Sequence, residues 1–296
     1  MGLLNPDTNY QVIRINKTFQ AQGNAHTAAA VADSSNYPAG ALSVIVTSSA
    51  SESITFHDTL VATGDNAFGN QQRLYVANWI PSYGDKINYK LTVKNNGSGK
   101  TVTNKTPLVL QKKITDLRSP SNTGLRLLDN TGAPGEGEVR FYNVSAGKIY
   151  NAIIRFNYME VRNGTDTTKK WIDYDAGSVV ANSTDLEVKI TFSAEQFFKK
   201  ISEKVVRTES STQFMFYSAK SIQIILTAGD ENIHNYMLVN APSSSLNQNK
   251  PEYTNLVGGY GLFASRSRKS FVARMDGNSE TFFLHSDYNL VNFSKK

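Results

Sequence analysis

Two pairs of carboxylates lie two residues apart on stretches with strand-like alternation. Asp173 and Asp175 form one pair, and Glu136 and Glu138 form the other. Side chains two apart on a strand point to one face about 6.6 Å apart, within the roughly 6.5–9.5 Å that inverting glycosidases use. Catalytic carboxylates usually come from different elements, however, and nothing in the sequence indicates a raised pKa. We therefore expect solvated acids, and a polysaccharide hydrolase using Asp173 and Asp175 is the alternative.

Two glycine-containing stretches resemble nucleotide-binding motifs only in part. Residues 97–101 read Gly-Ser-Gly-Lys-Thr, but Lys94 occupies the place of the first glycine that a phosphate-binding loop requires. Residues 259–264 fit G-x-G-x-x-A, with Glu280 near the place of a ribose-binding acid. Too little chain follows to complete a doubly wound sheet. We expect a turn at the first stretch and close backbone packing at the second.

Cysteine and histidine usage discounts several kinds of site. The chain has no cysteine, which excludes thiolate metal sites, Fe–S clusters and cysteine nucleophiles. Its four histidines form no His-Glu-x-x-His pattern, and a G-x-S-x-G nucleophile elbow is absent. We predict no catalytic residue, no metal ligand and no cofactor, and hence a protein that is not an enzyme.

Aromatic side chains are the better candidates for contact with a ligand. Exposed rings stack on sugar faces or anchor interfaces, and the chain has two tryptophans. Trp79, with Tyr83, lies in a loop-like context, whereas Trp171 lies on a strand-like one. Either tryptophan can instead belong to the core of a sandwich domain. We take Trp79, Tyr83 and Trp171 as candidate ligand-binding residues.

Basic residues outnumber acidic residues by 31 to 25, which gives a formal net charge of +6. They are scattered rather than gathered into the stripe that is typical of a nucleic-acid binder, so we expect no nucleic-acid partner. The tightest cluster contains Arg266, Arg268 and Lys269. It is either a solvated strand face or a contact for an acidic surface polymer, and Arg266 and Arg268 join the candidate ligand-binding residues.

The elements that must position these residues are mainly strands, because the dominant hydrophobic period is two. In residues 86–94, Ile87, Tyr89, Leu91 and Val93 fall on one face and lysines on the other. Residues 95–99 then form a turn to a partner strand over 101–110. Short strands separated by turns predict an immunoglobulin-like β-sandwich over residues 1–113.

Residues 114–296 are predicted to form a larger β-sandwich-type domain with one helix near 193–205. Ser193 and Gln196 match a capping box, and Phe197, Ile201 and Val205 follow on one helical face. A strand pair is expected within 214–226, a short helical piece near 231–236, and closing strands over 262–275 and 281–284. The length of 296 residues favours two domains, and the chain has no apolar run long enough to span a membrane as a helix.

Several short segments resemble uncharacterised surface lipoproteins of Bacteroidota. They are residues 10–19, 32–37, 88–93, 99–102, 153–160 and 253–263. The resemblance implies a signal peptide that ends in a lipidated cysteine, followed by a domain resting on the outer membrane. Because this chain carries neither feature, we expect it to be the extracytoplasmic part of such a protein, at the cell surface, with only a lipid anchor as its contact with membrane.

These observations together predict a non-catalytic cell-surface module for binding or assembly. Its expected partner is a glycan or another outer-membrane protein, engaged through aromatic side chains and backbone edges. The family offers no established catalytic residues that can be transferred to this chain. Two alternatives remain open, the polysaccharide hydrolase and a structural subunit of a surface fibre or secretion apparatus.

Overall fold

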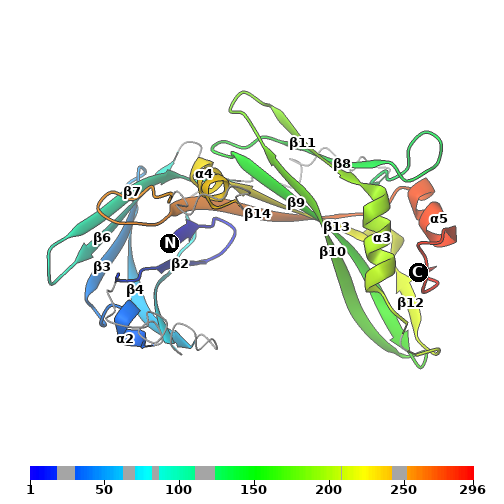
Figure 1. Cartoon of the computed structure of the whole chain (residues 1–296), viewed down its shortest axis with the longest axis horizontal. Helices are drawn as coiled ribbons and strands as arrows, with labels where there is room; N and C mark the ends of the chain where they lie inside the picture. Colours follow the sequence, from blue (N-terminus) through cyan, green and yellow to red (C-terminus); the bar gives the residue numbers. More distant parts are fainter. Residues whose placement is uncertain (19–30, 63–70, 82–86, 111–123, 208, 242–251) are drawn as a thin grey trace, which may run out of the picture. The chain divides into compact units, whose positions relative to one another are not determined.

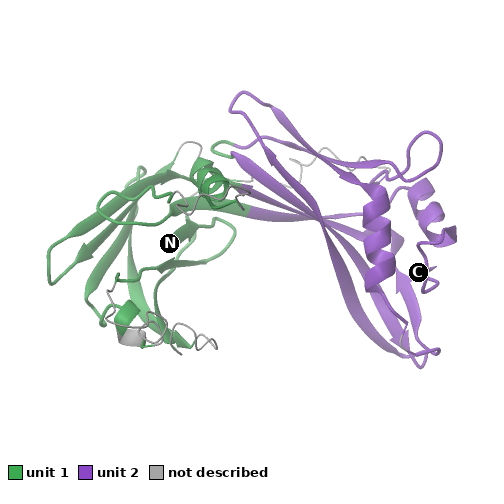
Figure 2. Ribbon diagram, viewed as in Figure 1, with its two compact units in different colours: residues 1–110, 145–147, 229–267 green, residues 111–144, 148–228, 268–296 purple. Residues whose placement is uncertain are grey.

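The computed structural model describes residues 1–18, 31–62, 71–81, 87–110, 124–207, 209–241 and 252–296. Strands account for 50% of the structure and helices for 14%, which confirms the all-β, sandwich-type fold expected from the sequence. The chain forms two compact units (Figure 2). Unit 1 contains residues 1–110, 145–147 and 229–267, and unit 2 contains residues 111–144, 148–228 and 268–296.

Unit 1 is built on a run of antiparallel strands, labelled in Figure 1. In hydrogen-bonded order they are β1 (Gly2–Leu4), β2 (Tyr10–Arg14), β5 (Gln71–Asn78), β4 (Ser53–Ala62), β3 (Leu42–Ser48), β6 (Asn88–Asn95) and β7 (Thr101–Pro107). The helices α2 (Ala32–Ser35) and α4 (Glu231–Asn240) accompany them. Tyr89, Leu91 and Val93 of β6 are buried in the core, and β6 pairs with β7 in the predicted hairpin.

Unit 1 contains a second long stretch of the chain, residues 229–267. Strand β14 (Phe263–Ala273) pairs in parallel with β1, Leu3 opposite Ala264. Buried Asp230 caps α4, and its carboxylate accepts hydrogen bonds from Thr106 Oγ1 at 2.6 Å and from the Ser265 backbone N–H at 3.0 Å. These hydrogen bonds connect residues far apart in the chain, so local sequence does not predict them. The domain boundary expected between residues 113 and 114 lies outside the described residues.

Unit 2 is built around a long hairpin of β9 (Ile149–Arg162) and β10 (Asp166–Val180). The other edge of β9 faces β12 (Gln213–Phe216) and β13 (Ile222–Gly229), and β14 and β15 (Ser294–Lys295) lie beyond these. A separate two-stranded sheet contains β8 (Glu136–Tyr142) and β11 (Glu187–Ser193). The expected strand pair within 214–226 is therefore two strands that both border β9.

Helix α3 (Ala194–Lys204) begins where the capping box predicts it. The Ser193 side chain accepts a hydrogen bond from the Gln196 backbone N–H at 3.2 Å, and Phe197 and Ile201 are fully buried. The helical piece expected near 231–236 is α4. The strand expected at 281–284 is instead part of helix α5 (Gly277–His285), because Asp276 caps the chain there and Phe283 turns into the core.

The inner face of the β9–β10 hairpin packs on an aromatic cluster. The ring of Phe156 lies 5.5–5.7 Å from the rings of Phe216, Phe283 and Phe293, measured between centroids. Successive side chains on a strand point to opposite faces, so the neighbours of Phe156 on β9 point outward. Arg155 and Asn157 are accordingly part-exposed, and they face the open side of the sheet.

Candidate functional site

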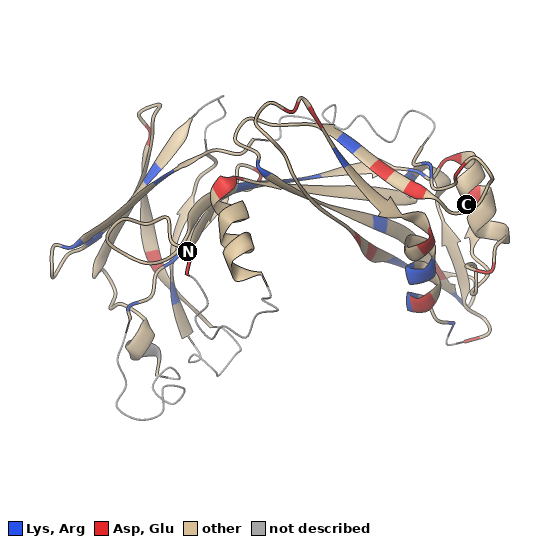
Figure 3. Ribbon diagram, turned by 45° about the horizontal axis from the view of Figure 1, so that its top comes forward, with Lys and Arg blue, Asp and Glu red and all other residues tan. Residues whose placement is uncertain are grey.

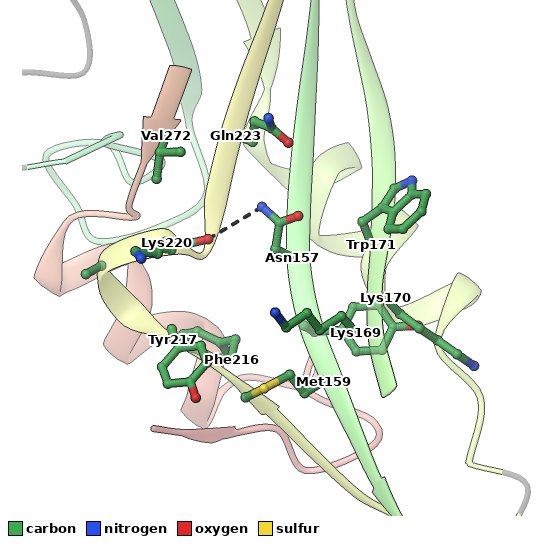
Figure 4. A pocket seen from close by; sticks show the side chains of 12 residues that line it. Asn157, Met159, Lys169, Lys170, Trp171, Phe216, Tyr217, Lys220, Gln223 and Val272 are labelled. Atoms are coloured by element: carbon green, nitrogen blue, oxygen red, sulfur yellow. Dashed lines mark hydrogen bonds between the residues drawn. The ribbon is translucent and has the colours of Figure 1, made fainter. Parts of the chain in front are cut away.

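The outer face of the unit 2 sheet carries a groove of about 690 Å³ (Figure 4). Trp171 and Lys169 of β10 form one wall, and Tyr217 and Lys220 form the other. Met159 of β9, only 5% exposed, lies between the walls and makes an apolar floor. A groove of this size with an aromatic wall and apolar floor is suited to part of an extended ligand.

The groove exists because the strand beside β9 is interrupted. Met215 of β12 pairs with Met159, whereas the next contact is made by Ser221, whose carbonyl accepts from the Asn157 backbone N–H at 2.8 Å. The chain advances six residues from Met215 to Ser221, whereas β9 advances only two between their partners Met159 and Asn157. The extra residues form the 3-10 turn Ser218–Lys220. An inserted segment of this kind redirects side chains out of the sheet. The turn is fixed from below, because the Ser218 hydroxyl donates to the buried carboxylate of Glu280 on α5.

Trp171 is held on the open face of the sheet by its neighbours. Its backbone pairs with Asn157 in the β9–β10 ladder, and its side chain is 57% exposed. The Arg155 guanidinium carbon lies 4.9 Å from the centroid of its ring. Arg155 is fixed in turn by two hydrogen bonds to Asp173, of 2.6 and 2.8 Å. Since Arg155 covers one face of the indole, the opposite face is open to a ligand.

Three polar side chains surround the floor of the groove. Asn157 donates from Nδ2 to the Lys220 carbonyl at 3.4 Å (dashed in Figure 4), which leaves its Oδ1 as an acceptor. The amide of Gln223 has no hydrogen-bond partner among the described residues. Tyr217 is 44% exposed, and the Lys296 ammonium lies 5.5 Å above its ring. Amides beside exposed rings can bind hydroxyl groups while the rings pack against C–H groups.

Of the two expected carboxylate pairs, Asp173, Asp175 and Glu138 are ion-paired or hydrogen-bonded, and Glu136 is exposed. Hydrogen bonding to Arg155 lowers the pKa of Asp173, and Asp175 accepts from Asn151 Nδ2 at 2.9 Å. Hydrogen bonding to Arg140 likewise lowers the pKa of Glu138. A general acid at neutral pH needs a raised pKa, so Asp173 is placed unfavourably for that role. We therefore leave the hydrolase as the weaker alternative.

Of the four candidate ligand-binding residues that the structure describes, only Trp171 lines the groove. Trp79 packs edge-on against Tyr89 in unit 1, with ring centroids 5.4 Å apart. Tyr83 lies outside the described residues. Arg266 and Arg268 are exposed on one face of β14, but the first belongs to unit 1 and the second to unit 2. Lys and Arg are spread over the strands of both units (Figure 3).

The glycine-containing stretches adopt the structures expected of them. Asn95 Oδ1 accepts hydrogen bonds from the backbone N–H groups of Gly97 and Ser98, both at 3.0 Å, which closes a hairpin turn. A Cβ atom at Gly259 would lie 3.0 Å from the Val102 side chain, so backbone packs closely there. Within the described part of the chain, no three His, Asp or Glu side chains gather as a metal site would require, and no helix is both long and apolar enough to cross a bilayer.

Comparison with known proteins adds no relative. No protein-family model matches the sequence, and a search of curated proteins finds no match. The groove itself is therefore the basis for inferring a function.

Sequence reasoning identified Trp171 but not the residues that complete the groove. Lys169, Asn157, Tyr217, Lys220 and Gln223 come from three segments that only the sheet brings together. One local signal was available, because Ser218, Lys220 and Ser221 interrupt a largely apolar stretch between 214 and 226. Such an interruption can mark a turn projecting from a strand.

Proposed function

We propose that this protein is a non-catalytic carbohydrate-binding module that acts at the cell surface. The groove on the outer face of unit 2 is its binding site, and Trp171 is the platform on which a sugar ring stacks. The cell-surface location rests on the sequence resemblance and on a composition rich in Asn, Ser, Thr and Tyr. A lipid anchor upstream of this chain would tether the module to the outer membrane.

The exposed and preorganised indole of Trp171 is the observation that carries the proposal. A large ring that is 57% exposed on a regular strand is unfavourable to leave in water, since burying such a ring is worth on the order of 1–3 kcal/mol. Arg155 and Asp173 fix the ring from one side, so little conformational entropy is lost when a ligand covers the other side. Flat aromatic platforms next to amide groups match a sugar, which has an apolar face and a polar rim.

A glycan fits this groove better than another outer-membrane protein does. Stable protein interfaces bury about 800 Å² on each partner around a hydrophobic centre. The groove instead combines the exposed rings of Trp171 and Tyr217 with amides and ammonium groups, and this combination suits a narrow, hydroxyl-rich chain. A protein partner that displaces the glycan remains an outcome that the binding experiment below can reveal.

A second candidate function, a subunit of a surface fibre or secretion apparatus, is favoured by one observation. Among the described strands, the 15-residue β10 hydrogen-bonds only to β9, and an unpaired edge can accept a strand from another chain. Two features oppose this pairing, the register shift between Asp175 and Gly177 and the run of charged side chains on β10. We expect sedimentation velocity to show no polymer as concentration rises, and filament growth would favour the fibre subunit.

The binding proposal predicts that Trp171→Ala weakens glycan binding. Loss of a stacked ring costs about 1–3 kcal/mol, or about 5- to 150-fold in affinity. The measurement is a glycan array probed with the full chain, followed by calorimetry on the glycans that bind. Tyr260→Ala is the matched control, because Tyr260 is 81% exposed but does not line the groove. Equal binding by the two variants, or capture of a protein partner with no glycan, would contradict the proposal.

A further inference from the structure

We infer that the sugar bound in this groove is acidic, carrying a carboxylate or a sulfate that lies between Lys169 and Lys220. This inference deepens the proposed function and rests on it, because it names the class of glycan that the groove takes. The inference is based on the excess of positive charge around the groove rather than on the aromatic ring of Trp171.

The groove lining contains lysines and no acidic residue. Lys169, Lys170 and Lys220 line it, and neither Asp nor Glu does. Lys170 is neutralised, since its Nζ lies 2.7 Å from Glu160 Oε1. Lys169 and Lys220 are exposed, and within the part of the chain that the structure describes, neither has a carboxylate at ion-pair distance. Two positive charges therefore remain uncompensated at the groove.

Two acidic residues of β9 and β10, Glu160 and Asp173, are already paired with cations. Asp173 is bound to Arg155, with Nε 2.6 Å from Oδ1. Glu160 has a side chain only 9% exposed and is shared by Lys170 and Arg162. Because these acids are neutralised by their own partners, they cannot offset the field of Lys169 and Lys220. An anion entering the groove meets a net positive site.

The two lysines stand on opposite walls of the groove. Figure 4 shows Lys169 extending from β10 across β9, above Met159, toward the wall that carries Tyr217 and Lys220. Lys220 belongs to the turn that Glu280 fixes through Ser218, so its backbone position is set. A sugar ring stacked on Trp171 would direct one substituent toward this pair, and an anionic substituent would gain two ammonium contacts there.

Charge contrast between two otherwise matched ligands provides the test. Oligogalacturonate and its fully methyl-esterified form share the same rings, and each anionic carboxylate of the first is a neutral methyl ester in the second. We expect the wild-type chain to bind the acidic form about fivefold to tenfold more tightly at low salt, the effect of two exposed charge contacts. Added salt should reduce this preference, because exposed charges are screened.

Two double variants distinguish the effect of the groove lysines from the effect of the protein's net charge. Lys169→Gln with Lys220→Gln should weaken binding of oligogalacturonate about fivefold to tenfold and leave binding of the methyl ester unchanged. The matched control is Lys90→Gln with Lys94→Gln, which removes the same charge from exposed positions on β6. We expect this control to bind both forms as the wild type does. Calorimetry on all three proteins gives the affinities, and thermal unfolding verifies that the variants fold.

The possible outcomes test the inference of an acidic ligand separately from the proposal of a glycan-binding site. Equal affinity of the wild type for both forms would overturn the acidic inference and leave the proposed glycan site standing. Binding of poly-L-glutamate as tight as that of oligogalacturonate, and unaffected by Trp171→Ala, would overturn the inference in favour of simple attraction between charges. Binding on the glycan array that is confined to neutral glycans and is weakened by Trp171→Ala would contradict the inference alone, whereas no binding of any glycan on the array would contradict the proposed function.

Discussion

The two tryptophans of this protein lie in opposite environments. Trp79, in unit 1, packs against the core and meets Tyr89 edge-on. Its indole Nε1 is buried without a hydrogen-bond partner among the described residues. Trp171, in unit 2, lies on a strand face with more than half of its surface open and a guanidinium beneath it. One ring is packed as part of the fold, and the other is presented to solvent.

The difference shows that the partners of a residue, not its type, determine its role. Trp79 has aromatic and aliphatic neighbours and is stabilised by their packing. Trp171 has an ion pair as its neighbour, and an ion pair on a surface adds little stability of its own. The arrangement of Arg155 and Asp173 therefore orients a ring more than it stabilises the unit. Four stability variants and one spectroscopic measurement test this contrast.

The largest expected effect is the loss of stability in Trp79→Ala. Removing a part-buried indole leaves a cavity beside Tyr89, and we expect the free energy of unfolding to fall by about 2–3 kcal/mol. Trp171→Ala serves as the comparison and should change it by less than about 0.5 kcal/mol, since its ring packs mainly against Arg155. Urea unfolding followed by circular dichroism measures both. Losses of equal size would erase the distinction between the two environments.

A smaller effect is expected from Asp173→Asn, and this effect depends on pH. Hydrogen bonding to Arg155 lowers the pKa of Asp173 in the folded protein, so the carboxylate stabilises the fold above its unfolded pKa of about 3.9. This contribution is lost as pH falls through the lowered folded-state pKa. We expect the variant to be about 0.5–1 kcal/mol less stable than the wild type at pH about 7.

Urea unfolding of both proteins at neutral and strongly acidic pH measures this dependence. The difference in stability should vanish once Asp173 of the wild type is protonated. Asp175→Asn is the matched control, because Asp175 accepts hydrogen bonds from Asn151 and Gly177 rather than from an ion-pair partner. A stability difference for Asp173→Asn that persists unchanged in acid would show that the ion pair does not fix Arg155.

Much of the fold follows from local sequence. Alternation in residues 86–94 gave the buried face of β6, and the Ser193–Gln196 capping box gave the start of α3. Helix α5 was missed because the Asp276 cap precedes a short segment with no clear helical period. The return of residues 229–267 to unit 1 depends on bonds such as Thr106 to Asp230, which connect residues far apart in sequence.

The groove was harder to predict than the fold. Trp171 could be named as a candidate, but the choice between it and Trp79 depended on burial, which their local sequences do not reveal. The outward direction of Asn157 follows from the alternation of β9. The position of Lys220 depends on the extra residues between Met215 and Ser221, and hence on the register with β9. Register is set by the whole sheet.

Fluorescence of a chain with a single tryptophan tests the central claim most directly. Because the protein has only two tryptophans, Trp79→Phe leaves Trp171 as the sole indole, and Trp171→Phe leaves Trp79. With oligogalacturonate added, we predict that the emission of Trp171 shifts to shorter wavelength and becomes protected from acrylamide, while that of Trp79 does not change. A saturable response from Trp79 alone, or ligand binding by calorimetry with no response from Trp171, would contradict the account.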